Sequence, residues 1–113
     1  MRYVLSLNKC VFYLYKGVHN FEKLFGQYYN LDAVFHIDCD YGNFHSYCSL
    51  YKFMRRFVYN FCFEYIEELC YLLCVSFLNK FSFLACVEVC VSKPVLLMGG
   101  ILEKTYVLIR IHR

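Results

Sequence analysis

The hydrophobic pattern of the chain changes its period once, near Asn79-Lys80. From about Tyr47 to Cys74, apolar residues recur at three- and four-residue steps, which predicts one long amphipathic helix. From Phe81 to Val91 they recur at every second position, which predicts a strand with one buried face. A chain that contains both patterns is expected to fold as α+β, with the helix packed on a sheet.

The segment before the long helix predicts shorter elements. Two apolar runs, Val4–Leu7 and Cys10–Tyr15, are separated by Asn8-Lys9 and predict two strands joined by a tight turn. Asn20 is expected to cap a short helix. Its apolar face, at three- and four-residue spacing, would contain Phe21, Leu24, Phe25 and Tyr28, and its polar side would contain Glu22, Lys23 and Gln27.

Two further features precede and follow the long helix. Ala33–Ile37 predicts a strand, and Asp38–Asn43 predicts a loop because of its Asp, Gly and Asn content. Near the C-terminus, Gly99-Gly100 is suited to a two-residue hairpin turn, and Tyr106–Ile111 predicts a last strand. Together with the strand from Phe81 these predict a C-terminal β-meander. Nothing marks a domain boundary, so residues 1–113 are expected to form a single domain.

The competing fold is helical with one membrane span, from Leu69 to Val87. Its length fits a bilayer. However, Lys80 lies near its middle, where a charge costs about 2.5 to 3.5 kcal/mol. Asn79-Lys80 also lies where a turn between helix and strand would be. We therefore favour the α+β fold over a membrane span.

Composition restricts the classes of function. Hydrophobic residues make up 60% of the chain and charged residues 19%, which excludes disorder caused by low hydrophobicity. The net charge of +3 comes from dispersed basic residues, so we expect no nucleic-acid partner. The N-terminal residues do not have the pattern of a signal peptide. We therefore expect the eight cysteines to be reduced and the protein to be cytoplasmic, with a membrane location as the alternative.

One loop contains residues that could bind a metal. His36, Cys39, His45 and Cys48 follow the spacing H-x2-C-x5-H-x2-C, and imidazole with thiolate is a zinc-binding combination. The five-residue spacer is shorter than in common zinc fingers. The alternative is a loop with incidental polar residues and no cofactor, which we favour because a chain so rich in cysteine contains such spacings by chance.

The chain contains no motif typical of an enzyme. It has no G-x-S-x-G, no phosphate-binding glycine loop, no dinucleotide fingerprint and no H-E-x-x-H. We therefore expect a non-enzymatic protein that acts through apolar and aromatic contacts with an unidentified protein partner. A small single-span membrane protein is the alternative.

Phe, Tyr and Cys are unusually frequent, with 12, 12 and 8 copies. Their codons all begin with T, which favours a gene on a T-rich coding strand. A viral accessory protein would show this bias. A chance reading frame antisense to an A-rich gene would show it too, and such a frame would have no function.

Overall fold

The computed structural model describes residues 1–17, 20–94 and 104–113. Within them, four antiparallel strands form one sheet in the order β1-β2-β3-β4. The strands are β1 (Arg2–Leu14), β2 (Gln27–Asp38), β3 (Leu84–Pro94) and β4 (Lys104–His112). The helices are α1 (Asn20–Phe25), α2 (Tyr47–Asn60) and α3 (Ile66–Lys80). The predicted α+β class is confirmed.

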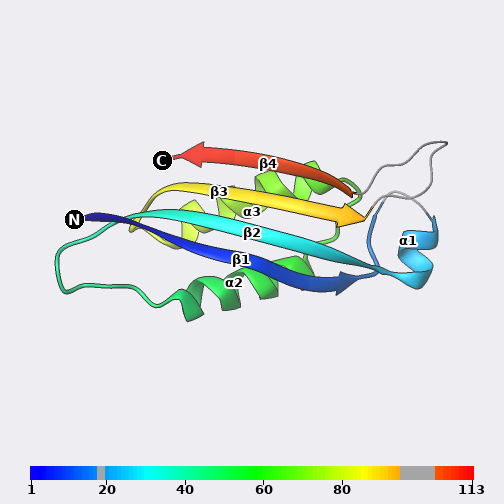
Figure 1. Ribbon diagram of the computed structural model, residues 1–113, viewed down its shortest axis with the longest axis horizontal. Helices are drawn as coiled ribbons and strands as arrows, with labels where there is room; N and C mark the ends of the chain where they lie inside the picture. The colour runs from blue at the N-terminus through cyan, green and yellow to red at the C-terminus, as the bar shows by residue number, and fades with distance from the viewer. Residues whose placement is uncertain (18–19, 95–103) are drawn as a thin grey trace.

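Helices α2 and α3 lie on the same face of the sheet, whereas α1 lies beyond one end of the strands (Figure 1). That end, where β1 and β3 finish and β2 and β4 begin, is called here the α1 end. Both chain termini lie at the opposite end, called here the termini end (Figure 1). Helix α1 therefore lies at one end of the sheet and the two chain termini at the other.

The predicted turn at Asn8-Lys9 is a β-bulge. β1 is continuous from Arg2 to Leu14 along β2, and its register shifts between Leu7 and Cys10. Lys9 has a φ of 55°, and its main-chain N–H donates to Oδ1 of Asp32 at 2.7 Å. The extra residue is thus accommodated without reversing the chain, which is the way a bulge differs from a turn.

The prediction of one long helix from Tyr47 to Cys74 is wrong. α2 ends at Asn60, and its C-cap Phe61 is extended, with φ −89° and ψ 124°. α3 begins at Ile66, so five residues separate the two helices. The connection contains Phe63, which is buried, so apolar residues continue through a segment that is not helical. Hydrophobic period alone therefore could not reveal the break.

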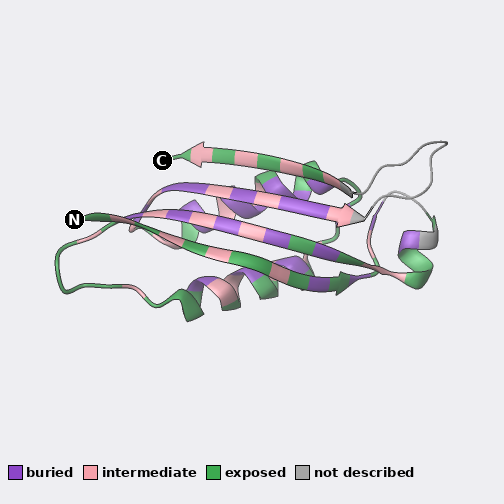
Figure 2. Cartoon of the chain, in the orientation of Figure 1, coloured by how far each residue is buried: buried purple, intermediate pink, exposed green. Residues whose placement is uncertain are grey.

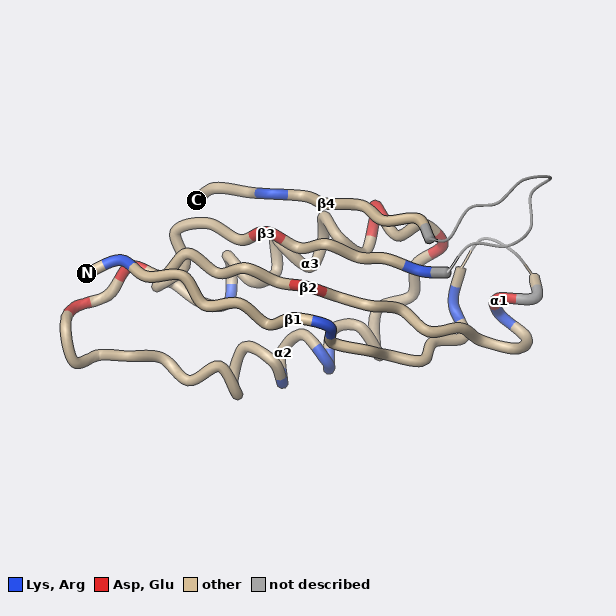
Figure 3. Tube along the Cα trace, in the orientation of Figure 1, with Lys and Arg blue, Asp and Glu red and all other residues tan. Residues whose placement is uncertain are grey.

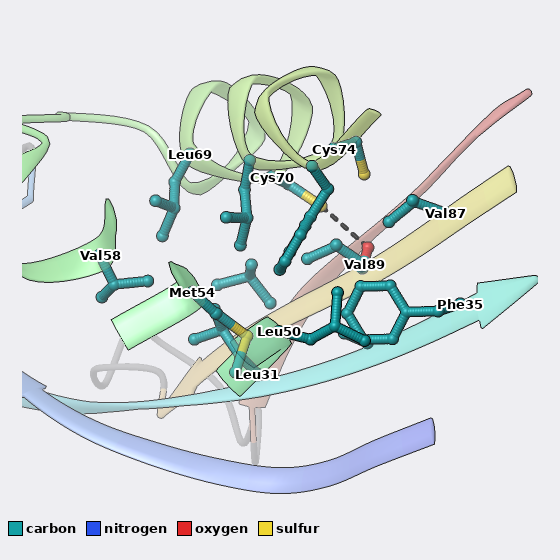
Figure 4. Packing of buried hydrophobic residues seen from close by; sticks show 14 of the residues in the cluster. Leu31, Phe35, Leu50, Met54, Val58, Leu69, Cys70, Cys74, Val87 and Val89 are labelled. Carbon is teal, nitrogen blue, oxygen red and sulfur yellow. Dashed lines mark hydrogen bonds between the residues drawn. The ribbon is translucent and has the colours of Figure 1, made fainter. Parts of the chain in front are cut away.

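The core lies between the helices and the sheet. Alternate residues of β2 and β3 point toward the helices, as the alternating burial along the strands shows (Figure 2). In Figure 4, Leu50, Met54 and Val58 of α2 meet Leu31 and Phe35 of β2. Cys70 of α3 donates its thiol hydrogen to the carbonyl of Val89 at 2.9 Å. Each fully buried Leu, Val, Met or Phe side chain stabilises the folded state by about 1.5 to 3 kcal/mol relative to the same side chain in water.

The C-terminal half agrees with several sequence predictions. α3 ends at Lys80 and β3 begins at Leu84, so Asn79-Lys80 marks the end of a helix, as expected. Val87, Val89 and Val91 share the buried face of β3. β4 includes the predicted strand Tyr106–Ile111, whereas Gly99-Gly100 lies outside the described residues. Among the described helices, none has the length and apolar character required to cross a membrane.

Candidate active site

Helix α1 begins at Asn20, as predicted, but it buries a residue that was expected to be exposed. Glu22 is 2% exposed, whereas Leu24 and Phe25 are each 72% exposed. The predicted apolar face of this helix is therefore wrong. A buried carboxylate is costly unless it is paired, so its position calls for a partner.

The partner of Glu22 is Lys93, close to the end of β3. The Lys93 Nζ lies 3.2 Å from Oε1 of Glu22, and the Lys93 side chain is 18% exposed. The other carboxylate oxygen, Oε2, is buried and has no hydrogen-bond partner within the described residues. A buried polar oxygen that lacks a partner is uncommon in native proteins, and a catalytic role is one of the explanations for such a group.

Gly17 lets the carboxylate approach the main chain. Its φ of 146° is rare for residues other than glycine, and an ideal Cβ added there would lie 1.6 Å from Oε2 of Glu22. Any other residue at position 17 would collide with the carboxylate and strain the main chain. Gly17 therefore contributes to the position of Glu22 by having no side chain.

A cavity of about 380 Å³ lies next to Gly17 and so close to Glu22, although neither Glu22 nor Lys93 lines it. The residues that follow β1 form one wall of the cavity, and the connection between α2 and α3 contributes to the other. Gly17, in the first wall, also lies against the carboxylate of Glu22. The lining residues are Tyr15, Lys16, Gly17, Lys23, Cys62, Phe63, Glu64 and Glu68. Acidic and basic segments lie together around α1 at this end of the sheet (Figure 3). The volume is in the range of small-molecule sites, about 300 to 1,000 Å³.

The wall next to β1 is fixed by Tyr29. Its hydroxyl donates to the main-chain oxygen of Lys16 at 2.6 Å and accepts from Nε2 of Gln27 at 2.9 Å. Burial raises the pKa of Tyr29 to about 12, so the hydroxyl keeps the proton that it donates.

The Glu22–Lys93 pair has the components of an acid–base centre. A carboxylate accepts protons and an ammonium group donates them, and the two are close enough to exchange one. Their shielding from water strengthens electrostatic interactions with any ligand that reaches Oε2. The arrangement suits a reaction in which one proton leaves a hydroxyl and another is delivered nearby.

The four candidate zinc ligands, which we expected more readily to be incidental residues of a loop, lie near the termini end. His36, on β2, has its Nε2 3.0 Å from Oε2 of Glu88. The His45 ring stacks on Phe83 with 3.6 Å between centroids. Cys39 is half-buried, and Cys48 is exposed in the first turn of α2. The described part of the chain contains no group of three or more metal-binding side chains, so these four are not brought together.

Comparison with protein families gives a match along nearly the whole chain. The sequence profile of the family FolB, dihydroneopterin aldolase, matches residues 5–110. The chain belongs to the dihydroneopterin aldolase family. The matched range contains Glu22, Lys93 and every residue that lines the cavity.

Solved structures share the fold of this family member at low identity. A dihydroneopterin aldolase described as putative, from Vibrio cholerae, has a TM-score of 0.82 and 14% identity, and the match covers 97% of each chain. A Burkholderia dihydroneopterin aldolase bound to guanine has a TM-score of 0.78 and 14% identity, with 99% of this chain and 92% of that chain covered. The Escherichia coli enzyme in complex with neopterin has a TM-score of 0.77 and 16% identity, covering 96% and 97%. None of the curated proteins compared with the chain matches it.

Membership in an aldolase family overturns the functional prediction made from sequence. The chain is not the non-enzymatic, orphan protein that was expected, nor a functionless reading frame, because the family match covers residues 5–110. The absence of common catalytic motifs does not exclude an enzyme. Many acid–base centres consist of single side chains with no short signature around them.

Glu22 and Lys93 were missed because they are 71 residues apart. No local spacing could connect them. Gly17, five positions before Glu22, carries no sequence signal that links it to a carboxylate. The one available signal was Glu22 itself, an acidic residue in a short helix whose other side chains are mostly apolar.

Proposed function

We propose that the chain is an aldolase that cleaves a carbon–carbon bond in the hydroxylated side chain of a reduced pterin, with dihydroneopterin as the substrate. The observation that carries the proposal is the buried Glu22–Lys93 pair, in which Oε2 of Glu22 has no partner within the described residues. Family membership supplies the reaction class.

Such a cleavage requires two proton transfers. A base removes the proton of the hydroxyl on the departing carbon, so that this fragment leaves as an aldehyde. The electron pair of the broken bond moves into the conjugated C=N bond of the ring. An acid then protonates the carbon that remains attached to the ring.

Glu22 and Lys93 can perform both steps. We assign the carboxylate of Glu22 as the base and the Lys93 ammonium as the acid. Once Lys93 has given up its proton, the carboxyl group of Glu22 returns one to Nζ from Oε1, the oxygen 3.2 Å away, which restores the starting state. These side chains supply every proton in the scheme, and the proposal includes no cofactor.

The neighbouring cavity is suited to the ring of the substrate. Guanine and neopterin, found in two structurally similar aldolases, both carry an amino-pyrimidinone edge with N–H donors. Glu64 and Glu68 place carboxylates in the cavity wall, and carboxylates accept hydrogen bonds from such an edge. Phe63 adds an aromatic surface against which a flat ring can pack.

The remaining sequence predictions become part of this proposal. No disulfide bond joins cysteines within the described part of the chain, and we propose the reducing cytoplasm as the location. Contact with a protein partner, and the lack of a nucleic-acid partner, stay predictions. The small-molecule substrate replaces the protein partner as the ligand of the site.

The proposal is tested with purified protein and dihydroneopterin, by chromatography of the pterin product and trapping of the aldehyde. We expect turnover by the native chain and a loss of at least about 100-fold in kcat for Glu22→Gln and for Lys93→Met, since each removes one proton-transfer group. Lys52→Met is the matched control, because Lys52 is exposed on α2. A correctly folded native chain that does not accelerate the cleavage would overturn the proposal.

A further inference from the structure

Lys16 links the segment that follows β1 to the end of α2 and to the connection after α2. Its Nζ donates to the main-chain oxygens of Val58 at 2.9 Å, Tyr59 at 2.9 Å and Phe61 at 2.7 Å. The last carbonyls of a helix have no partners within the helix, and a cation placed there also interacts favourably with the helix dipole. One ammonium group therefore completes the C-terminus of α2.

The main chain of Lys16 is held from the other side. Its carbonyl accepts the hydrogen bond from the hydroxyl of Tyr29, a fully buried residue of β2. The residue is thus fixed to the sheet through its main chain and to α2 through its side chain. Few long side chains are fixed at both ends, because the loss of rotamer freedom costs up to about 2 kcal/mol.

Both walls of the cavity meet at Lys16. Tyr15 and Gly17, its neighbours in the chain, belong to one wall, and Cys62 and Phe63 belong to the other. The Nζ atom lies between them, 5.9 Å from the centroid of the Phe63 ring, which is a cation–π distance. The two walls come from segments that are more than 40 residues apart, and this ammonium joins them.

We propose that Lys16 is a positioning residue for the substrate, which holds the two walls of the cavity at the separation that the pterin ring requires. This inference rests on the proposed function. Lys16 takes no part in proton transfer, which is assigned to Glu22 and Lys93. It acts through the main-chain segments that line the cavity.

The environment of the ammonium group is consistent with such a role. Burial lowers the pKa of Lys16 from its usual value, while the nearby thiol of Cys62 acts in the opposite direction. Three carbonyl oxygens compensate for the lost hydration. A side chain of the same length without a charge, such as methionine, could fill the space but could not hold α2 to the end of β1.

The chain contains a matched control for this arrangement. Arg113 completes the C-terminus of α3 in the same manner, with its guanidinium donating to the carbonyls of Leu78, Phe81 and Leu84. It lies at the termini end, where β3 begins, whereas Lys93 lies where β3 ends. Arg113→Met therefore removes an equivalent helix cap without touching the cavity.

The first experiment separates substrate binding from chemistry. For Lys16→Met we expect KM for dihydroneopterin to rise about tenfold, with kcat within about threefold of the native value, because the acid–base pair is intact. Lys16→Arg should return KM to within about threefold, since a guanidinium can donate to the same carbonyls. Arg113→Met should leave KM unchanged. An unchanged KM in Lys16→Met, or an equal rise in Arg113→Met, would overturn the proposal.

A second measurement does not depend on catalysis. Hydrogen exchange of residues 57–64, followed by mass spectrometry, should become at least about tenfold faster in Lys16→Met and stay unchanged in Arg113→Met. This result would support the connection between the walls even if the native chain showed no aldolase activity. Native-like exchange in Lys16→Met would refute it even in an active enzyme. If the methionine variant does not fold, Lys16→Gln, which keeps one donor group, takes its place in both experiments.

Discussion

The two ends of the sheet use charged residues in different ways. At the α1 end, Glu22 and Lys93 form an ion pair in which the carboxylate is 2% exposed, and Lys16 joins the cavity walls. At the termini end, Arg2 and Asp38 form an ion pair at a similar distance, 3.2 Å, but their side chains are 82% and 49% exposed. Distance therefore does not distinguish the two pairs, whereas burial does.

This difference agrees with the acid–base role that we propose for the α1 end. An exposed pair is screened by water and contributes about 0 to 1 kcal/mol, so it places few demands on the surrounding structure. A buried pair is costly to build and keeps its interactions only where the geometry is fixed. Gly17, Tyr29 and Lys16 provide that fixed geometry at the α1 end, and the termini end needs no equivalent.

The largest expected effect tests the buried pair. Lys93→Met leaves the carboxylate of Glu22 without its countercharge, and we expect the free energy of unfolding to fall by about 3 to 5 kcal/mol. Urea denaturation followed by circular dichroism measures this change. The double variant Glu22→Leu with Lys93→Met should recover most of the loss, because no unpaired charge remains. A loss below about 1 kcal/mol in Lys93→Met would show that the pair behaves like an exposed one.

The sequence predicted the general fold better than the site because fold class follows from local patterns. The change of period near Asn79-Lys80 placed the end of α3 and the buried valines of β3, since both depend on neighbouring residues. The break between α2 and α3 was missed because Phe61, Cys62 and Tyr65 continue the three- and four-residue apolar spacing through a non-helical connection. Local apolar spacing does not report how the main chain is capped.

The site could not be derived in the same way. His36, Cys39, His45 and Cys48 have a metal-ligand spacing that is visible locally in the sequence, but they lie near the termini end without forming one group. Glu22 and Lys93 meet only after β2 and β3 have paired, which joins residues 71 positions apart. Burial of Glu22 in place of Leu24 and Phe25 is a tertiary effect that overrides the local apolar pattern.

The middle of the molecule offers a test that neither end should influence. Burial raises the pKa values of Cys70 and Cys74 from 9.0 to about 12 each. The folded chain therefore retains protons that the unfolded chain loses above pH 9, so this contribution to stability is complete below pH 9. It falls as the pH rises toward 12, by about 1.4 kcal/mol per pH unit for each thiol.

Urea denaturation at pH 8.5, 9.5 and 10.5 measures this dependence. Cys70→Ala and Cys74→Ala should each reduce the slope of stability against pH by about 1.4 kcal/mol per unit above pH 9. Cys48→Ala should leave the slope unchanged, because the Cys48 side chain is exposed on α2. If the two buried variants kept the native slope, the alkaline loss would have to arise from the ends of the sheet.

The smallest expected effect concerns the exposed pair at the termini end. Asp38→Asn removes the charge that faces Arg2 but keeps the main-chain hydrogen bond from Asp38 to the carbonyl of Phe83. We expect a loss of at most about 1 kcal/mol, reduced further in about 1 M salt, where charges are screened beyond about 3 Å. A cycle with Arg2→Gln isolates the coupling between the two side chains. If the coupling reached about 3 kcal/mol, burial could not be what separates the two ends, and the reason for placing the chemistry beside Glu22 would be lost.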